Sequence, residues 1–226
     1  MTTNAVHVPL GHADYGDTLE LQRQTRERRI RGEIPDTLLT VEHDPVFTFG
    51  RSSSPADLLA SADAITKEGI ALHHIERGGG ITYHGPGQLV AYPIVDLRDH
   101  GRDVHRFVHL LEDALLTVVH ALGVRADRRS GHPGLWLEGR KLASLGIHVR
   151  RWVTCHGIAL NVQVNRHHFG MIRPCGEAID VVSLADCIHP PPSTEEVESR
   201  LLASLADRFG WTIRRKDATW LTAGSE

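Results

Sequence analysis

The chain has 226 residues, of which 41% are hydrophobic and 23% charged, and its formal net charge is -3. This is the composition of a globular protein with a core of its own, and the charge excludes a global attraction to nucleic acid or to an anionic membrane. The N-terminus lacks a secretory signal pattern, and no apolar run approaches the about 20 residues of a membrane span. Three widely spaced cysteines, an odd number, predict a reducing compartment and a cytoplasmic location.

Strands and helices alternate in the first half of the chain. Helix-favouring residues without proline predict one helix at 17–31, ended by Gly32 and Pro35, and a second at 61–68. Apolar runs bounded by turn residues predict five strands, at residues 5–10, 36–42, 46–49, 70–75 and 89–95.

The clearest helical pattern covers residues 104–122, where apolar side chains recur at i, i+3, i+4 and i+7. Asp103 precedes it as an N-cap, and Gly123 follows as a stop signal. Its polar face is expected to carry His105, His109, Glu112 and Asp113.

The second half begins with a predicted hairpin, whose strands at 134–138 and 141–150 are joined by a turn at Gly139-Arg140. A strand at 152–164 and a loop at 165–170 follow. Ser193 and Glu196 form a capping box that opens a helix, Gly210 ends that helix, and residues 211–215 predict a last strand.

This order of elements predicts an α/β (α+β) fold with a mixed or largely antiparallel sheet, not a doubly wound one. No regular structure is expected after residue 215. The length suits a single domain over residues 1–226, with a core at about 36–215.

One stretch, RGGGITYHGPGQ at residues 77–88, concentrates five glycines between two strands that we expect to be buried. Glycine permits positive φ and close backbone approach, and a plain hairpin needs only about two turn residues. The stretch therefore predicts a ligand-handling loop. It has neither the ending of a phosphate loop nor the spacing of a dinucleotide motif, which argues against nucleotide binding.

A cysteine, Cys175, and a lysine, Lys141, suggest covalent chemistry. Cys175 stands between Pro174 and Gly176, and it can be read equally as a nucleophile or as a buried small residue. Cys155 and Cys187 lie in apolar runs, so we interpret both as buried small hydrophobic residues.

Lys141 lies where the predicted hairpin turns into a strand. If it points inward it must be paired or deprotonated, and it could then serve a thiolate as counter-ion and proton shuttle. A solvated turn lysine is the ordinary alternative.

Histidines are abundant, with sixteen in the chain. His84 could act as general acid or base, could position a substrate, or could bind only backbone. The His156-Gly157 step could offer backbone N–H groups to a carbonyl oxygen, or simply begin a strand. His105 and His109 are one helical turn apart, but no third ligand motif accompanies them, so we expect no metal ion and no cofactor.

The motif at 77–88 resembles the signature of the lipoyl(octanoyl) transferases, the LipB family of octanoyl-[acyl-carrier-protein]:protein N-octanoyltransferases. Three further blocks match that family in order: KLASLG at 141–146, HGIALNV at 156–162 and IRPCG at 172–176. The resemblance extends from about Leu39 to Leu184. Gly80 and Cys155 depart from the family pattern without removing a functional position.

The resemblance implies the fold of biotin and lipoate protein ligase catalytic domains. It implies transfer of octanoyl from acyl carrier protein to a lysine on lipoyl domains of 2-oxoacid dehydrogenases and on the glycine-cleavage H protein. It also implies Cys175 as nucleophile, Lys141 as the residue that lowers the thiol pKa, and His84 as a third catalytic candidate. The substrate contacts that it implies are Arg77, Gly78, Gly79, Gly80, Ile81, Thr82, Tyr83, His84, Ser144, Leu145, Gly146, Gly157, Ile158 and Ala159.

On this hypothesis an oxyanion would be stabilised by N–H groups of residues 142–144 or of the glycine loop. The arginines within residues 23–31, or Arg150-Arg151, are candidates for docking acidic partners, although solvated arginines are the ordinary alternative. Two other functions remain open: an ATP-dependent lipoate or biotin ligase of the same fold, and a catalytically inactive binding module.

Overall fold

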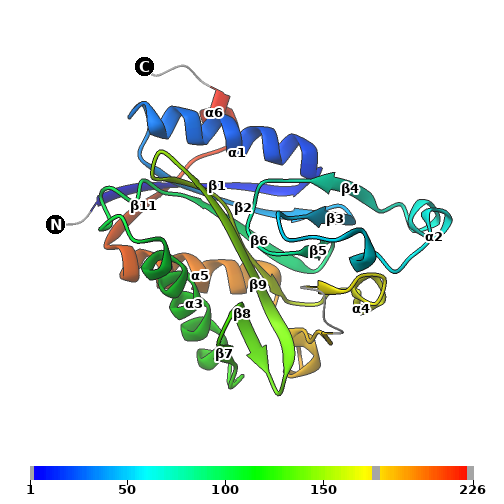
Figure 1. Cartoon of the computed structure of the whole chain (residues 1–226). Coiled ribbons are helices and arrows are strands. Elements are labelled where there is room, and N and C mark those ends of the chain that lie inside the picture. The colour runs from blue at the N-terminus through cyan, green and yellow to red at the C-terminus, as the bar shows by residue number, and fades with distance from the viewer. Residues whose placement is uncertain (1–2, 175–178, 223–226) are drawn as a thin grey trace.

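The computed structural model describes residues 3–174 and 179–222. Its main element is a large mixed sheet (Figure 1). The spatial order of its eight strands is β11 (Trp211–Arg215), β1 (Thr3–Ala13), β2 (Asp36–His43), β6 (Gln88–Ile94), β10 (Val153–Asn161), β9 (Arg140–Arg150), β8 (His132–Leu137) and β7 (Asp127–Arg129). β1 pairs with β11 and β2 in parallel and the other pairs are antiparallel, which confirms the predicted mixed sheet.

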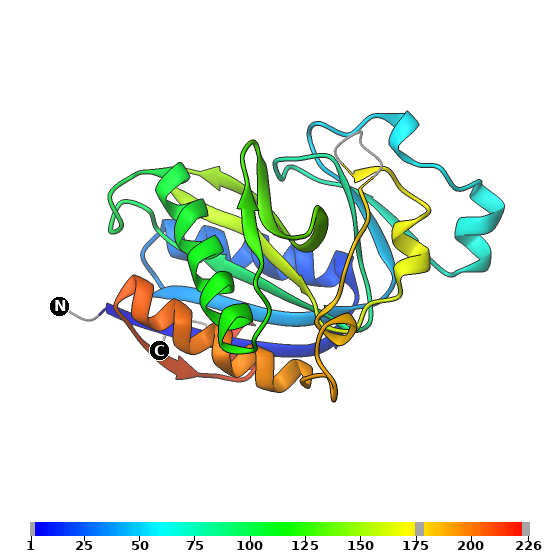
Figure 2. The ribbon, with the colours of Figure 1, turned by 90° about the horizontal axis from the view of Figure 1, so that it is seen from below.

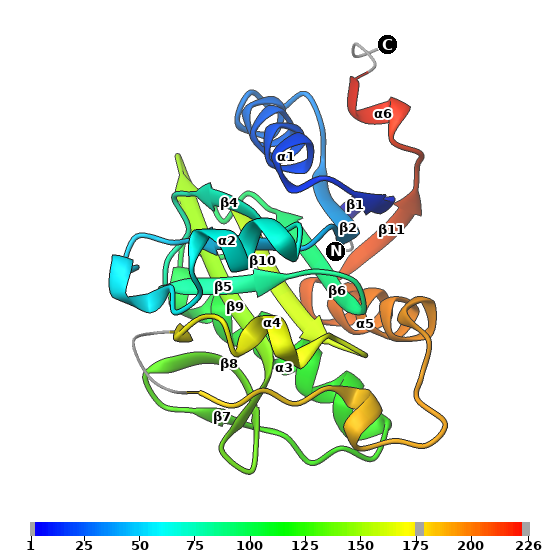
Figure 3. The same cartoon turned by 90° about the vertical axis from the view of Figure 1, so that its right-hand side faces the viewer.

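A second sheet of three strands, in the order β4 (Ala71–His74), β3 (Val46–Phe49) and β5 (Ile81–His84), lies at one end of the large sheet. The short helices α2 (Ala62–Lys67) and α4 (Arg166–Phe169) lie beside it (Figure 3). Two expectations are corrected here. The glycine-rich stretch contains a strand, β5, and the strand before it, β4, is a largely exposed edge rather than a buried strand.

Helices cover both faces of the large sheet (Figure 2). One face is covered by α1 (Tyr15–Ile30), and the other by α3 (Val104–Ala121) and α5 (Thr194–Phe209). Side chains of β6 alternate between the layers: Leu89 packs under α3 and α5, and Val90 packs under α1. Burial on both faces explains why this strand is a continuous apolar run.

The helices α3 and α5 begin at the capping residues that the sequence predicted. The Asp103 side chain accepts a hydrogen bond from the N–H of Arg106, and Ser193 accepts one from the N–H of Glu196. Gly210 adopts a left-handed φ of 66° where α5 ends. Each N-cap contributes about 1 kcal/mol to stability. None of the described helices is long and apolar enough to cross a membrane.

Short elements differ from the expectations, because tertiary pairing rather than local sequence defines them. Residues 165–170 contain α4 instead of a loop, β7 was not predicted, and α6 (Thr219–Thr222) follows the last strand, with Leu221 buried. The hairpin turn is Glu138-Gly139, both at positive φ, rather than Gly139-Arg140. Among the described residues, 3-10 turns lie at Pro55–Asp57 and Leu184–Asp186.

Two further corrections concern burial. The core does not begin near residue 36, because β1 lies inside the large sheet between β11 and β2. Glu112 is not on a solvated face: one carboxylate oxygen accepts from the N–H of Gly134 at 2.9 Å, and the other from Arg128 Nε at 2.9 Å. The charge of Glu112 is therefore buried but paired.

Candidate active site

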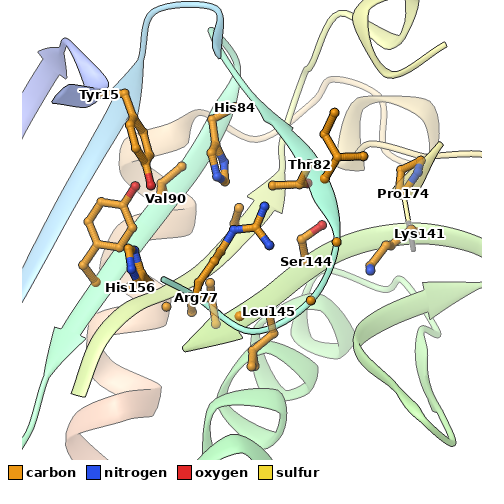
Figure 4. Close-up of a pocket in the computed structure, with 18 residues that line it drawn as sticks. Tyr15, Arg77, Thr82, His84, Val90, Lys141, Ser144, Leu145, His156 and Pro174 are labelled. Carbon is orange, nitrogen blue, oxygen red and sulfur yellow. The ribbon is translucent and has the colours of Figure 1, made fainter. Parts of the chain in front are cut away.

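A cavity lies between the glycine-rich stretch and the strands β6, β9 and β10 (Figure 4). The empty space in and around it, open solvent included, is about 550 Å³. Lys141 lines it together with most of the substrate contacts that the resemblance implied: Arg77, Gly79, Gly80, Ile81, Thr82, His84, Ser144, Leu145, Gly146, Gly157, Ile158 and Ala159.

The strand β5 decides which of its side chains reach the cavity. Thr82 and His84 share one face of β5, because successive strand residues point to opposite sides. Tyr83 is turned the other way: its hydroxyl contacts His168 Nδ1 at 2.8 Å and its ring packs edge-on against Phe169. Tyr83 therefore does not line the cavity, whereas Ile81, at the start of β5, lines it together with Thr82 and His84.

Hydrogen bonds hold the glycine loop against the strands β9 and β3. The N–H of Gly78 donates to the carbonyl of Ile147 at 3.0 Å, and the Arg77 guanidinium donates to the carbonyl and hydroxyl oxygens of Thr48 at 2.7 and 2.8 Å. A Cβ on Gly146 would lie 2.9 Å from the carbonyl oxygen of Gly78. Glycine at this position therefore lets the loop backbone contact β9 directly.

A chain of buried hydrogen bonds runs from His84 to β9. His84 Nδ1 donates to Gln88 Oε1 at 2.7 Å, and Gln88 Nε2 donates to Asn161 Oδ1 at 2.9 Å. Asn161 Nδ2 donates in turn to the carbonyls of Lys141 and Val182, at 3.3 and 3.1 Å. These amides assign the His84 proton to Nδ1 and tie the glycine-rich motif to the backbone of Lys141.

Lys141 is a buried strand residue, not a solvated turn lysine. Its ammonium nitrogen lies 5.1 Å from the centre of the Trp136 ring, a cation–π distance. Its backbone is hydrogen-bonded to the segment after residue 178: its N–H donates to Asp180 and its carbonyl accepts from Val182. In Figure 4, Lys141 lies beside Pro174, which also lines the cavity.

Cys175, the predicted nucleophile, lies outside the described residues. The described residues on both sides of it are anchored near the cavity. The N–H of Arg173 donates to the carbonyl of Asp57 at 2.7 Å, Pro174 lines the cavity, and the segment from Asp180 pairs with Lys141.

Pairing within the large sheet reduces the number of backbone N–H groups that could stabilise an oxyanion. Ala143 pairs with Leu135 on one side and Leu160 on the other, and Ser144 pairs with Gly134 and Ala159. N–H groups in a strand paired on both sides are used by the ladders. Leu142 lies at the register shift between β8 and β9 and is paired in neither ladder. Leu142 and the glycine loop therefore stay the predicted donors.

Among the described residues, five that line the cavity were not predicted as site residues: Tyr15, Val90, Tyr92, His156 and Pro174. Val90 and Tyr92 could have been found, since strand alternation puts them on one face of β6. His156 had been noted only for its backbone; it adopts a φ of 63°, its N–H donates to Gln22 Oε1 at 3.0 Å, and its ring lines the cavity.

Burial keeps three histidines around the cavity neutral. Desolvation lowers the pKa of His43 to about 4 and those of His84 and His156 to about 3 each. His43 Nδ1 donates to the carbonyl of Ala13, so its Nε2 accepts from the Tyr92 hydroxyl at 2.8 Å. At neutral pH, a His84 with this pKa is a weak proton acceptor, which favours a positioning role.

These pKa values predict acid lability. An unfolded histidine has a pKa near 6.5, so below that pH the unfolded chain binds protons that the folded chain excludes. Stability is complete above about pH 6.5 and falls with pH by about 1.4 kcal/mol per unit for each such histidine. In urea unfolding between pH 6 and 5, His43→Gln is expected to reduce the slope of unfolding free energy against pH by that amount.

The control for this prediction is His105→Gln, at an exposed position on α3. It should leave the slope unchanged. Equal slopes for His43→Gln and the parent protein would show that His43 is protonated in the folded state.

The other two cysteines, Cys155 and Cys187, do not line the cavity, and neither do Arg150 and the arginines of α1. Cys155 is buried as predicted, and burial raises the pKa of its thiol to about 11, whereas Cys187 is exposed, against the prediction. The arginines of α1 are engaged within the molecule: Arg23 pairs with Glu76, and Arg29 with Asp36 and Asp99. Arg150 pairs with Glu27. These pairs weaken the case for a docking surface there.

No group of three His, Cys, Asp or Glu side chains suited to a metal ion occurs in residues 3–174 and 179–222. His109, half of the predicted histidine pair, instead contacts Glu112, with 3.3 Å between Nδ1 and Oε2.

Comparison with known proteins identifies the family. The model of the lipoyl protein ligase A/B catalytic domain matches residues 14–206. The chain belongs to this family. Within the lipoyl protein ligase A/B family it is 43% identical over 204 residues to an octanoyltransferase of Solibacter usitatus, covering 90% of this chain and 92% of that protein. It is 39% identical over 208 residues to an octanoyltransferase of Alkaliphilus metalliredigens, covering 91% and 95%.

Solved structures of the lipoyl protein ligase A/B family share the fold. A lipoate-protein ligase A bound with ATP superposes with a TM-score of 0.75 at 16% identity, covering 98% of this chain and 91% of that one. A putative lipoate protein ligase of T. acidophilum with bound lipoic acid superposes with a TM-score of 0.72 at 16% identity, covering 98% and 91%. The predicted ligase-like fold is confirmed.

Proposed function

We propose that this protein transfers an octanoyl group from acyl carrier protein to a lysine side chain of a lipoyl domain, the first step of endogenous protein lipoylation. The observation that carries the proposal is identity of 43% and 39%, over nine-tenths of the chain, to proteins named octanoyltransferase. The cavity supports it, because Val90, Ile158 and Ala159 provide apolar lining. About six buried methylenes would contribute about 5 kcal/mol to binding.

The reaction proceeds in two acyl transfers. The Cys175 thiolate attacks the donor thioester, a new thioester forms on Cys175, and the donor thiolate leaves and takes up a proton. The acceptor amine then attacks the enzyme thioester, the amide forms, and the Cys175 thiolate is restored as the amine loses a proton. The ammonium of Lys141 is the counter-ion of the thiolate and exchanges these protons, and neutral His84 positions the glycine-rich motif.

The proposal extends to partners and compartment. The acceptors are the lipoyl domains of 2-oxoacid dehydrogenases and the glycine-cleavage H protein. We place the reaction in the cytoplasm, and the odd number of cysteines supports this placement.

Transfer from octanoyl carrier protein to a lipoyl domain is expected to proceed without ATP. Initial rates at varied concentrations of both substrates should give the parallel double-reciprocal lines of ping-pong kinetics. The acylated lipoyl domain is measured by mass spectrometry.

The alternatives give different results in the same assay. A ligase of this fold would use free octanoate or lipoate together with ATP and would ignore the carrier-bound donor. An inactive binding module would leave the lipoyl domain unmodified under both conditions. Either outcome would contradict the proposed function.

A further inference from the structure

A second hollow adjoins the cavity on the other side of the glycine loop. It is a groove with about 1250 Å³ of empty space, open in part to solvent. Val108 of α3 and His132 of β8 line it, as do Ile147 of β9 and the segment around Ser54. None of these four side chains lines the cavity.

The groove and the cavity share part of their walls. Both are lined by the loop glycines and by Lys141, Leu145 and Gly146. At this contact the backbone of Gly78 lies against Gly146 with no side chain between them. Lys141 and Leu145, both labelled in Figure 4, therefore lie where the two hollows meet.

The lining of the groove is mixed. Val108, Pro133 and Ile147 supply apolar walls, and Ser52, Ser54 and Asp57 supply polar ones; the Ser54 hydroxyl also accepts a hydrogen bond from the N–H of Ala56. The adjacent Arg51 is exposed and brings positive charge to this edge. An arm that alternates amide groups with aliphatic carbons and ends in a phosphate matches such a lining.

We propose that the groove receives the pantetheine arm of the acyl carrier while the acyl chain occupies the cavity, so that the thioester lies at their junction beside Lys141. This rests on the proposed function. The two parts of the donor then occupy two separate hollows, and a change in the groove should affect the arm without affecting the acyl chain.

The test replaces Val108, which lines only the groove, by Trp, and compares two octanoyl donors. One is octanoyl carrier protein, and the other is octanoyl-N-acetylcysteamine, which lacks most of the arm. Val108→Trp is expected to raise KM for the carrier-bound donor about tenfold in the acylation step, and to change acylation by the short donor less than about twofold. Arg106→Trp, at an exposed position on nearly the opposite side of the same helix from Val108, is the matched control and should change neither.

The other outcomes overturn the inference. Equal slowing of both donors would place the effect in the cavity. Normal acylation by both donors with slower transfer to the lipoyl domain would assign the groove to the acceptor lysine. If the parent protein is acylated by neither donor, the proposed function itself fails. Should Val108→Trp not fold, Val108→Phe makes the same test with a smaller side chain.

Discussion

Alanine in place of Cys175 is expected to lower the rate of octanoyl transfer by about 10⁴-fold or more, because the atom that carries the acyl group is removed and only binding and orientation remain. Intact mass spectrometry should show one octanoyl group on the parent protein after incubation with octanoyl carrier protein, and none on Cys175→Ala. Initial rates of lipoyl-domain acylation measure the loss.

The chain offers two matched controls, Cys155→Ala and Cys187→Ala. The Cys155 thiol is buried, donates to Gln22 Oε1 at 3.5 Å and has a pKa raised to about 11 by burial. Both variants should still take up one octanoyl group and keep their transfer rate within about threefold. A Cys175→Ala protein that retains a tenth of the parent rate, or an octanoyl group mapped to Cys155, would remove Cys175 from the proposed mechanism.

Elements with local signals were predictable from the sequence. The helix α3 combines a regular apolar period with Asp103 at its start and Gly123 after its end, and the structure reproduces its bounds within one residue. The same holds for α5 between Ser193 and Gly210. Caps and periodicity act within one turn of a helix, so they can be read without knowledge of the fold.

Site residues could be named from the motifs, but their orientation could not. The glycine-rich stretch did not reveal that residues 81–84 pair with β3. That pairing separates Thr82 and His84 from Tyr83. Lys141 likewise had two readings, and the choice between them came from Trp136 and from a segment about forty residues away.

The surroundings of charged side chains were the hardest feature to predict from the sequence. The arginines of α1 suggested a docking surface, but their carboxylate partners come from distant parts of the chain: Glu76 for Arg23, and Asp99 for Arg29. Glu112 was assigned to a polar helix face, and its partners Arg128 and Gly134 come from the strands that pack on α3. A sequence shows a charge but not the partner that neutralises it.

Replacement of Lys141 by Met is expected to slow transfer about thirtyfold at pH 7 through loss of thiolate alone, and further through loss of the group that exchanges protons. A cation about 4 Å from a thiolate contributes about 4 kcal/mol at an effective dielectric constant of 20. Without it the thiol ionises near its ordinary pKa of about 8.5, so the loss should be largest at neutral pH and shrink as the pH approaches 9. The pH profile of alkylation by iodoacetamide measures this shift directly.

The Lys141→Met variant should fold, because an unbranched apolar chain can pack on the Trp136 ring, over which the lysine ammonium lies now. Lys67→Met, at an exposed position, is the matched control and should alter neither rate nor pH profile. Lys141→Arg separates the two proposed roles: it keeps a positive charge and should restore the alkylation profile, but guanidinium does not release a proton, so transfer stays slow. An alkylation profile of Lys141→Met that coincides with that of the parent protein would exclude Lys141 as the counter-ion of the thiolate.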